Sequence, residues 1–189
     1  LVGSEMCIRD RYKGLTLGLR DYIAKNNFPG VLLGLSGGID SALSAVLAVD
    51  ALGADKVTCV MMPSPFTSQD SLDDAKALAD TLGCAYETIS IEQAMDAFES
   101  TIPDLQGVAH ENMQSRARGL ILMALSNSSG KMVLSTGNKS EMAVGYATLY
   151  GDMCGGFNAL KDLYKMQVYT LSEWINRNGE RIPKRIITK

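Results

Sequence analysis

The sequence predicts an α/β fold in which a doubly wound parallel sheet carries helices on both faces. Short apolar runs of strand length alternate along the chain with longer segments of helical periodicity, and such alternation is typical of βαβ units. Polar clusters also follow three predicted strands, at 36–41, 63–70 and 135–141. Ligands bind beyond the carboxyl ends of the strands in such sheets, so we expect these clusters to meet at one edge.

Each element follows from local sequence signals. The run at 31–35 is continuously apolar, as in a strand buried on both faces, and the helices repeat apolar residues every three or four positions. Gly53 and Gly83 are expected to end helices, and Pro63 is expected to end a strand. Ser68 or Ser71 is expected to be the N-cap of a helix. In chain order we predict a helix at 13–26, a strand at 31–35, a helix at 41–52, a strand at 56–62, a helix at 68–82, a strand at 85–91, helices at 92–100 and 111–127, a strand at 131–135 and a helix at 165–178.

Composition narrows the class of protein. The 189 residues are 46% hydrophobic and 21% charged, which is ordinary for a globular domain. A net charge of −3 gives no basis for non-specific binding of nucleic acid, and the apolar runs are too short to cross a membrane. Four scattered cysteines without a CxxC pair predict a reducing, cytoplasmic setting and no disulfide framework.

The first ten residues, LVGSEMCIRD, resemble the translation of a sequencing-library adapter, so we expect residues 1–11 to be a non-native scar. The remaining residues, 12–189, are then expected to be one domain that is truncated at both ends.

The stretch SGGIDS, residues 36–41, lies where the first strand gives way to a helix. A tight turn at a helix start leaves backbone N–H groups without partners, and the helix N-terminus adds partial positive charge. Glycines let this backbone approach a ligand closely, which predicts a phosphate site. Asp40 would repel phosphate unless it holds a divalent cation that bridges the phosphates. The alternative is that Asp40 and Ser41 only cap the helix while the glycines only pack.

SGGIDS resembles the signature of the ATP pyrophosphatase group, whose members cleave ATP between its α- and β-phosphates. It is neither a GxxxxGK[ST] nor a GxGxxG motif. Three more segments, ENMQSRARG (111–119), STGNKSEMAVGYATLYGD (135–152) and KDLYK (161–165), resemble the NAD synthetase family. The similarity is greatest to the synthetase domain of the glutamine-dependent form, and it implies a Rossmann-like fold of the adenine nucleotide alpha-hydrolase type.

The resemblance implies a ligase that forms a carbon–nitrogen bond. In that family ATP adenylates the nicotinate carboxylate of deamido-NAD, pyrophosphate leaves, and ammonia displaces AMP to give NAD. ATP is the implied co-substrate and Mg²⁺ the implied metal. No side-chain nucleophile is needed, because the protein's task is to position two anions and neutralise their charge.

The resemblance to the NAD synthetase family also implies functional roles for the residues that match its motifs. Asp40 and Lys165 are the implied catalytic residues, and Asp40 and Glu141 the implied Mg²⁺ ligands. Asn112, Arg116 and Glu141 are the implied contacts to deamido-NAD, with Arg118 as a second arginine on the same helix. The implied ATP-binding residues are Gly34, Leu35, Ser36, Gly37, Gly38, Ile39, Asp40, Ser41, Thr136 and Lys165.

Each role has a structural alternative. Arg116 and Arg118 fit a solvated helix face, and Glu141 fits the first turn of a helix, where acids favour the dipole. Lys165 fits a surface lysine, and Asn112 an ordinary cap.

The resemblance also bears on partners. The ammonia-dependent form carries a lysine where Leu149 stands, which favours the glutamine-dependent form. Its glutaminase domain, which supplies ammonia from glutamine, is expected upstream. We further expect a homodimer formed through the 111–127 helix, no nucleic acid and no membrane. The competing functions are another ATP pyrophosphatase ligase, GMP synthetase-like or tRNA-modifying, and a non-catalytic nucleotide-binding module.

Overall fold

Five parallel strands form the sheet, in the order β3-β2-β1-β4-β5. The structure is a computed structural model that describes residues 2–189, and it confirms the predicted α/β class. The strands are β1 (Val31–Gly34), β2 (Val57–Met61), β3 (Ala85–Thr88), β4 (Met132–Ser135) and β5 (Phe157–Asn158). The α-helices are α1 (Val2–Lys25), α2 (Ile39–Leu52), α3 (Gln69–Leu82), α4 (Glu92–Thr101), α5 (Gly107–Ser129), α6 (Lys139–Val144), α7 (Lys165–Ile175) and α8 (Lys184–Thr188). Two 3₁₀ turns, Ala54–Lys56 and Asn176–Asn178, complete the described elements.

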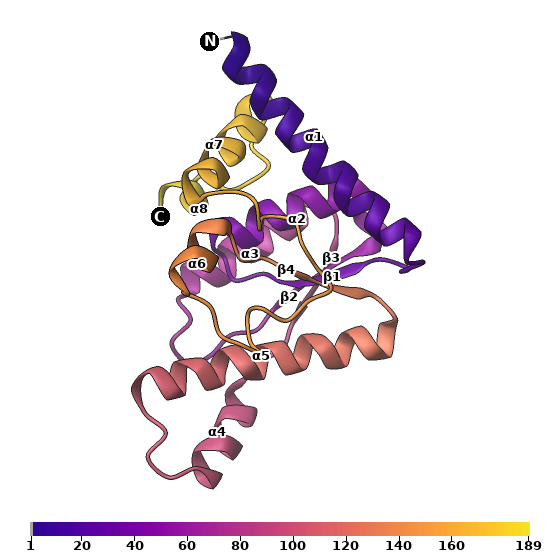
Figure 1. Ribbon diagram of the computed structural model, residues 1–189. Coiled ribbons are helices and arrows are strands. Elements are labelled where there is room, and N and C mark those ends of the chain that lie inside the picture. Colours follow the sequence, from indigo (N-terminus) through magenta and orange to yellow (C-terminus); the bar gives the residue numbers. More distant parts are fainter. Residues whose placement is uncertain (1) are drawn as a thin grey trace.

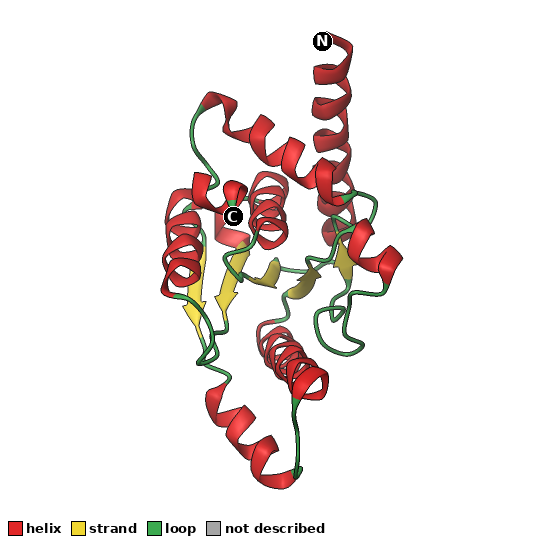
Figure 2. Cartoon of the chain, turned by 90° about the vertical axis from the view of Figure 1, so that its left-hand side faces the viewer, coloured by secondary structure: helices red, strands yellow, loops and turns green. Residues whose placement is uncertain are grey.

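Alternate residues of the central strands face two separate apolar layers. In β1, Val31 and Leu33 pack into the larger core with helices α1, α2, α3, α7 and α8, whereas Leu32 packs into a smaller core with α4 and α5. The period of two follows from the pleat of a strand. Helices therefore cover both faces of the sheet, as predicted, and Figures 1 and 2 show the strands between the two helical layers.

Most predicted boundaries lie close to the observed ones. Ser68 caps α3 by accepting a hydrogen bond from the Ser71 N–H, and Gly83 ends that helix in the left-handed conformation with φ of 67°. Gly53 ends α2, as predicted. Helix α5 begins at Gly107 instead of residue 111, and β3 ends at Thr88, three residues before the predicted end at 91.

Helix α1 is the largest boundary difference, because it begins at Val2 instead of residue 13. Ile8, Tyr12 and Leu15 pack against the larger core. They extend the helical spacing of Leu19 and Ile23 toward the N-terminus, so the apolar stripe continues into the first residues.

Three short elements, α6, β5 and α8, were outside the prediction. Strand β5 has two residues and is defined by its pairing with β4, where Phe157 pairs with Leu134. Helix α8 is held by Ile186, which is buried in the larger core. None of the helices within residues 2–189 has the length and apolar character needed to cross a bilayer.

The strand order places a topological switch between β1 and β4. From β1 the chain adds β2 and β3 on one side, then crosses to β4 and β5 on the other. In open parallel sheets the two loops that leave a switch point diverge and open a crevice at the carboxyl ends of the strands. The 36–41 turn follows β1 and the 135–141 stretch follows β4, so both border this crevice.

Candidate functional site

The glycine turn joins β1 to α2 and requires glycine at its centre. Gly37 has φ of +76°, and a Cβ added there would lie 2.6 Å from the Ser71 carbonyl oxygen of α3. Ser41 Oγ accepts a hydrogen bond from the Ser36 N–H at 3.2 Å and donates to the Gly38 carbonyl at 2.9 Å. The turn is therefore packed against α3 and closed by its own serines, while helix α2 begins directly after it at Ile39.

Of the other residues predicted for ATP binding, some line a cavity and one is buried in the core. Gly34 and Leu35 line a cavity beyond the sheet edge, together with Ser36 and Thr136. The Ile39 side chain is buried in the larger core, so only its backbone is available to a ligand at the turn.

Asp40 and Glu141 lie at the same edge of the sheet, as the predicted convergence of strand ends implied, and Lys165 contacts both. The Lys165 ammonium forms an ion pair and hydrogen bond with Asp40 Oδ2, and it lies 4.0 Å from Glu141 Oε1. Both carboxylates are partly shielded, with 16% of the Asp40 side chain and 32% of the Glu141 side chain exposed. One ammonium thus faces two carboxylates that are 101 positions apart in the sequence.

Asn138, which was not among the predicted site residues, organises this cluster. Its side chain is fully buried, donates through Nδ2 to Asp40 Oδ1 at 2.9 Å, and accepts the Glu141 N–H at 3.0 Å. Glu141 Oε2 in turn accepts the Asn138 N–H at 3.1 Å. This reciprocal pair is a capping box at the start of α6, and the N-x-x-E spacing in STGNKSE was the signal that could have revealed it.

A cavity of about 590 Å³ opens beside the turn, over the carboxyl ends of β1, β2 and β4 and against α5. Its apolar lining includes Val60, Met62, Leu122 and Leu134. A smaller cavity of about 180 Å³ lies over Asp40, Ser41 and Glu141, and the two share Ser36, Thr136 and Asp152 as lining residues. The site therefore has an apolar chamber next to a polar one that holds the charged cluster.

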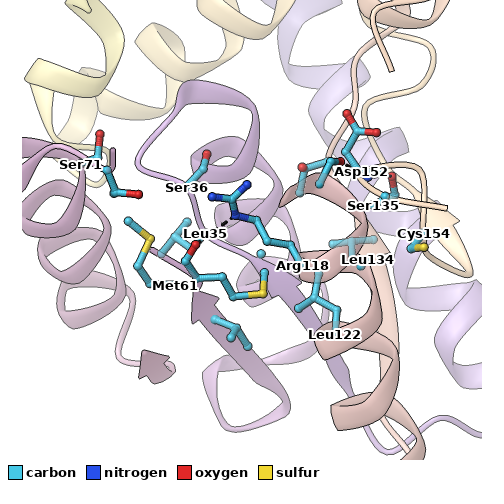
Figure 3. Close-up of a pocket in the computed structure, with 18 of the residues that line it drawn as sticks. Leu35, Ser36, Met61, Ser71, Arg118, Leu122, Leu134, Ser135, Asp152 and Cys154 are labelled. Carbon is cyan, nitrogen blue, oxygen red and sulfur yellow. Dashed lines mark hydrogen bonds between the residues drawn. The ribbon is translucent and has the colours of Figure 1, made fainter. Parts of the chain in front are cut away.

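Arg118 and Arg116 differ in what they contact. Arg118 lines the larger cavity, donates from Nε to the Met62 carbonyl at 3.0 Å, and points toward Ser36 (Figure 3). Burial lowers the pKa of the Arg118 guanidinium, but arginine stays protonated near neutral pH. Arg116 is exposed and donates from Nε to the Leu149 carbonyl at 3.2 Å. Only Arg118 of the two lines the cavity.

Helix α5 also holds the loop between α6 and β5. Asn112 Oδ1 accepts the Thr148 hydroxyl at 2.8 Å, and Ser115 Oγ accepts the Asp152 N–H at 3.0 Å. The Ser135 hydroxyl donates to the Asp152 carbonyl at 3.1 Å, and Figure 3 shows Asp152 and Ser135 beside the cavity. Ser115, Ser135 and Asp152 line the cavity but were not predicted, because their significance depends on where this loop folds.

The family model described as NAD synthase matches residues 11–189. The chain belongs to this family. The glutamine-dependent NAD(+) synthetase of Rhodobacter capsulatus is 53% identical over 199 residues, which cover 96% of this chain and 36% of that protein. The chain spans about a third of the length of the curated relatives it matches.

Solved structures of NAD synthetases share the fold. The glutamine-dependent NAD+ synthetase from Acinetobacter baumannii, in complex with ADP, superposes with a TM-score of 0.94 at 48% identity, over 96% of this chain and 36% of that chain. The NH3-dependent NAD synthetase from Campylobacter jejuni, in complex with the nitrate ion, gives a TM-score of 0.90 at 32% identity, over 96% of this chain and 77% of that chain. These similarities agree with the family that the sequence motifs indicated.

Proposed function

We propose that this domain amidates deamido-NAD to NAD, using ATP to adenylate the nicotinate carboxylate and ammonia to displace AMP. The observation that carries the proposal is the geometry at the switch point, where a glycine turn, two carboxylates and a lysine border an apolar cavity. The similarity to NAD synthetases supports the same reaction.

The cavity is suited to a purine base. Val60, Met62, Leu122 and Leu134 provide apolar contact area, and a ligand base in this chamber places its phosphates toward Ser36 and the turn. There the N-terminus of α2, which begins directly after the turn, favours negative charge. Arg118 lines the same chamber and supplies a planar guanidinium that can pair with a phosphate or carboxylate.

The residues present fit Mg²⁺. Asp40 and Glu141 offer carboxylate oxygens, which are the ligands that this hard cation prefers, and Mg²⁺ is usually held by one or two carboxylates together with substrate phosphates. Within residues 2–189 no three acidic, cysteine or histidine side chains gather to form an all-protein metal site, which agrees with a metal that needs the phosphates as well. When bound, the ion would neutralise charge on the phosphates.

The chain's own groups account for the remaining requirements of the reaction. The turn binds the departing pyrophosphate through backbone N–H groups, and Lys165 supplies a positive charge next to it. Asn138 fixes Asp40 and Glu141 at the carboxyl ends of neighbouring strands. The nicotinate carboxylate then attacks the α-phosphorus as pyrophosphate leaves, and ammonia attacks the resulting mixed anhydride as AMP leaves.

Partners follow from the same proposal. Ammonia would come from glutamine through a glutaminase domain, as the names of the curated relatives indicate for them, and the protein would work in the cytoplasm.

We also propose a homodimer through α5, where Leu120 and Met123 are exposed while Ile121 and Leu125 pack inward. Sedimentation of the chain and of a Leu120→Glu variant tests the dimer: a wild-type monomer contradicts it.

The test of the function is pyrophosphate release from ATP by the intact protein that contains this domain, with deamido-NAD, ammonium and Mg²⁺, followed together with NAD formation. Continued release and NAD formation should need all four components, because without ammonium the adenylate is not consumed and release stops after one pyrophosphate per site. Release with XMP or tRNA in place of deamido-NAD would instead favour another ATP pyrophosphatase ligase. ATP binding that is independent of Mg²⁺, without release, would favour a non-catalytic binding module, although the assembled Asp40, Glu141 and Lys165 argue for chemistry.

A further inference from the structure

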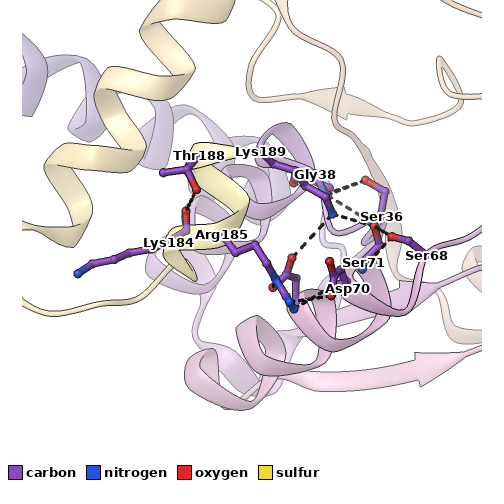
Figure 4. Close-up of polar contacts among 11 residues, drawn as sticks. Ser36, Gly38, Ser68, Asp70, Ser71, Lys184, Arg185, Thr188 and Lys189 are labelled. Carbon is purple, nitrogen blue, oxygen red and sulfur yellow. Dashed lines mark hydrogen bonds and ion pairs between the residues drawn. The ribbon is translucent and has the colours of Figure 1, made fainter.

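Lys189 extends from the end of α8 toward the glycine turn. Its ammonium donates to Ser71 Oγ at 2.9 Å and lies 3.8 Å from Asp74 Oδ2 (Figure 4). Ser71 lines the larger cavity together with Ser36. The Ser71 backbone also lies against Gly37, since a Cβ on Gly37 would be 2.9 Å from the Ser71 Cα. One residue thus separates the ammonium from the centre of the predicted phosphate site.

Fixed contacts hold the helix that carries Lys189. Arg185 donates from Nε to Asp74 Oδ1 and from Nη1 to Asp70 Oδ1, both at 2.8 Å. Ile186, on the inner side of α8, is buried in the larger core. The position of Lys189 beside α3 is therefore set by packing and by two ion pairs, and does not depend on its own contacts alone.

The ammonium has unused hydrogen-bonding capacity. A lysine carries three N–H donors, and one of them is used by Ser71. The contact with Asp74 Oδ2 is too long for a hydrogen bond, so that buried oxygen has no hydrogen-bond partner in the described part of the chain. Asp74 thus attracts the ammonium electrostatically while leaving its donors available for a second anion.

We propose that Lys189 is a phosphate-binding residue for the nucleotide at the glycine turn, with Ser71 and Asp74 as its positioning residues. This inference rests on the proposed function and deepens it. Lys165 approaches the turn at Asp40 on α2, whereas Lys189 approaches at Ser71 on α3. The triphosphate of the nucleotide would therefore meet ammonium groups from both helices that flank the turn.

The experiment measures binding of ATP in the presence of Mg²⁺, and of adenosine, by calorimetry on the wild-type chain and on Lys189→Met, Lys189→Arg and Lys184→Met. Lys184 is the matched control, because it is an exposed lysine on the same helix and points away from the turn in Figure 4. We expect Lys189→Met to weaken ATP binding roughly ten- to a hundredfold, the effect of one charge-assisted hydrogen bond. Adenosine binding should stay within about twofold, Lys189→Arg should recover most of the loss, and Lys184→Met should match wild type.

The outcomes separate this inference from the proposed function. Unchanged ATP affinity in Lys189→Met overturns the phosphate role of Lys189 alone. An equal loss for ATP and adenosine also overturns it, because that pattern means that Lys189 only supports the shape of the cavity. A wild-type chain that binds no ATP at all overturns the proposed function, and this inference with it. Asp74→Asn adds a second test, since it should weaken ATP binding less than Lys189→Met while sparing adenosine.

Discussion

Gly37→Ala tests whether the phosphate turn depends on the absence of a side chain. Two separate costs are expected. The residue has φ of +76°, and an alanine in the left-handed region costs roughly 1–2 kcal/mol. The new Cβ would also lie 2.6 Å from the Ser71 carbonyl oxygen, which is backbone and cannot rotate away. Either α3 or the turn must then move.

Two matched glycines separate these costs. Gly83 has φ of +67° with nothing within 4 Å of an added Cβ, so Gly83→Ala carries the conformational cost alone, about 1 kcal/mol. Gly38 has φ of −99°, and its added Cβ meets the movable Ser36 hydroxyl at 3.3 Å, so Gly38→Ala should stay within about 0.5 kcal/mol of wild type. Gly37→Ala should cost about 3 kcal/mol in total, since overpacking adds roughly 1–3 kcal/mol to the conformational cost.

Urea unfolding followed by circular dichroism provides the assay. With a slope of about 3 kcal/mol per molar urea, a loss of about 3 kcal/mol lowers the midpoint by roughly 1 M, and the loss in Gly83→Ala lowers it by about a third of that. ATP binding should also disappear in Gly37→Ala but persist in Gly83→Ala. Equal midpoints for Gly37→Ala and Gly83→Ala would refute the argument that contact with α3 forces glycine at position 37.

Three further predictions concern charged groups. Asp40→Asn keeps a side-chain oxygen that can accept from Asn138 but loses the ion pair with Lys165. Pyrophosphate release should therefore fall at least ~100-fold while the urea midpoint stays nearly unchanged. Full turnover in this variant would contradict the proposed role of Asp40 as a metal ligand. Arg118→Gln should weaken ATP binding about tenfold or more, whereas Arg116→Gln, which alters only the Leu149 contact, should not; the reverse order would contradict the assignment. Burial raises the pKa of Asp50, but hydrogen bonds from Arg181 and Tyr12 outweigh it and leave that pKa below its usual value. The stabilisation is therefore present above the unfolded pKa of about 3.9 and lost as pH falls through the lower folded pKa, so Asp50→Asn should cost roughly 1 kcal/mol at pH 7 and almost nothing at about pH 2. If the difference in urea midpoint between wild type and Asp50→Asn grows as the pH is lowered, the ion pair between Asp50 and Arg181 does not stabilise the fold in the predicted way.

Local signals predicted the parts of the fold that local physics determines. The β1 run, the end of α2 at Gly53 and the αL cap at Gly83 follow from apolar patterning and glycine conformation within a few residues. Strand β5 could not be found in this way, because two residues carry no pattern and become a strand only by pairing with β4. Helix α8 is likewise fixed by contacts distant in sequence, namely the burial of Ile186 and the ion pair between Arg185 and Asp74 of α3.

The choice between Arg116 and Arg118 shows a second limit of sequence reasoning. Asn112 and Arg116 lie one turn apart on α5, and both contact the loop between α6 and β5. Which face of α5 turns toward the cavity depends on how the helix packs on the sheet, and Leu122 and Ala117 in the smaller core set that rotation. Arg118 consequently reaches the Met62 carbonyl at the end of β2, a contact that spacing along a single helix does not reveal.

The charged cluster combines a predictable part with an unpredictable one. Asp40 follows β1 and Glu141 follows β4, which are neighbours in the sheet, so the rule that parallel strands end at one edge brings the two carboxylates together. Lys165 follows β5, which the sequence did not predict, and its position depends on how α6 meets the start of α7. The Lys139 N–H donates to the Leu163 carbonyl at 2.8 Å, and the Lys165 N–H donates to Ser140 Oγ at 3.0 Å. These two bonds fix the start of α7 beside α6, and they deliver a cation to a pair of carboxylates whose repulsion would otherwise oppose folding.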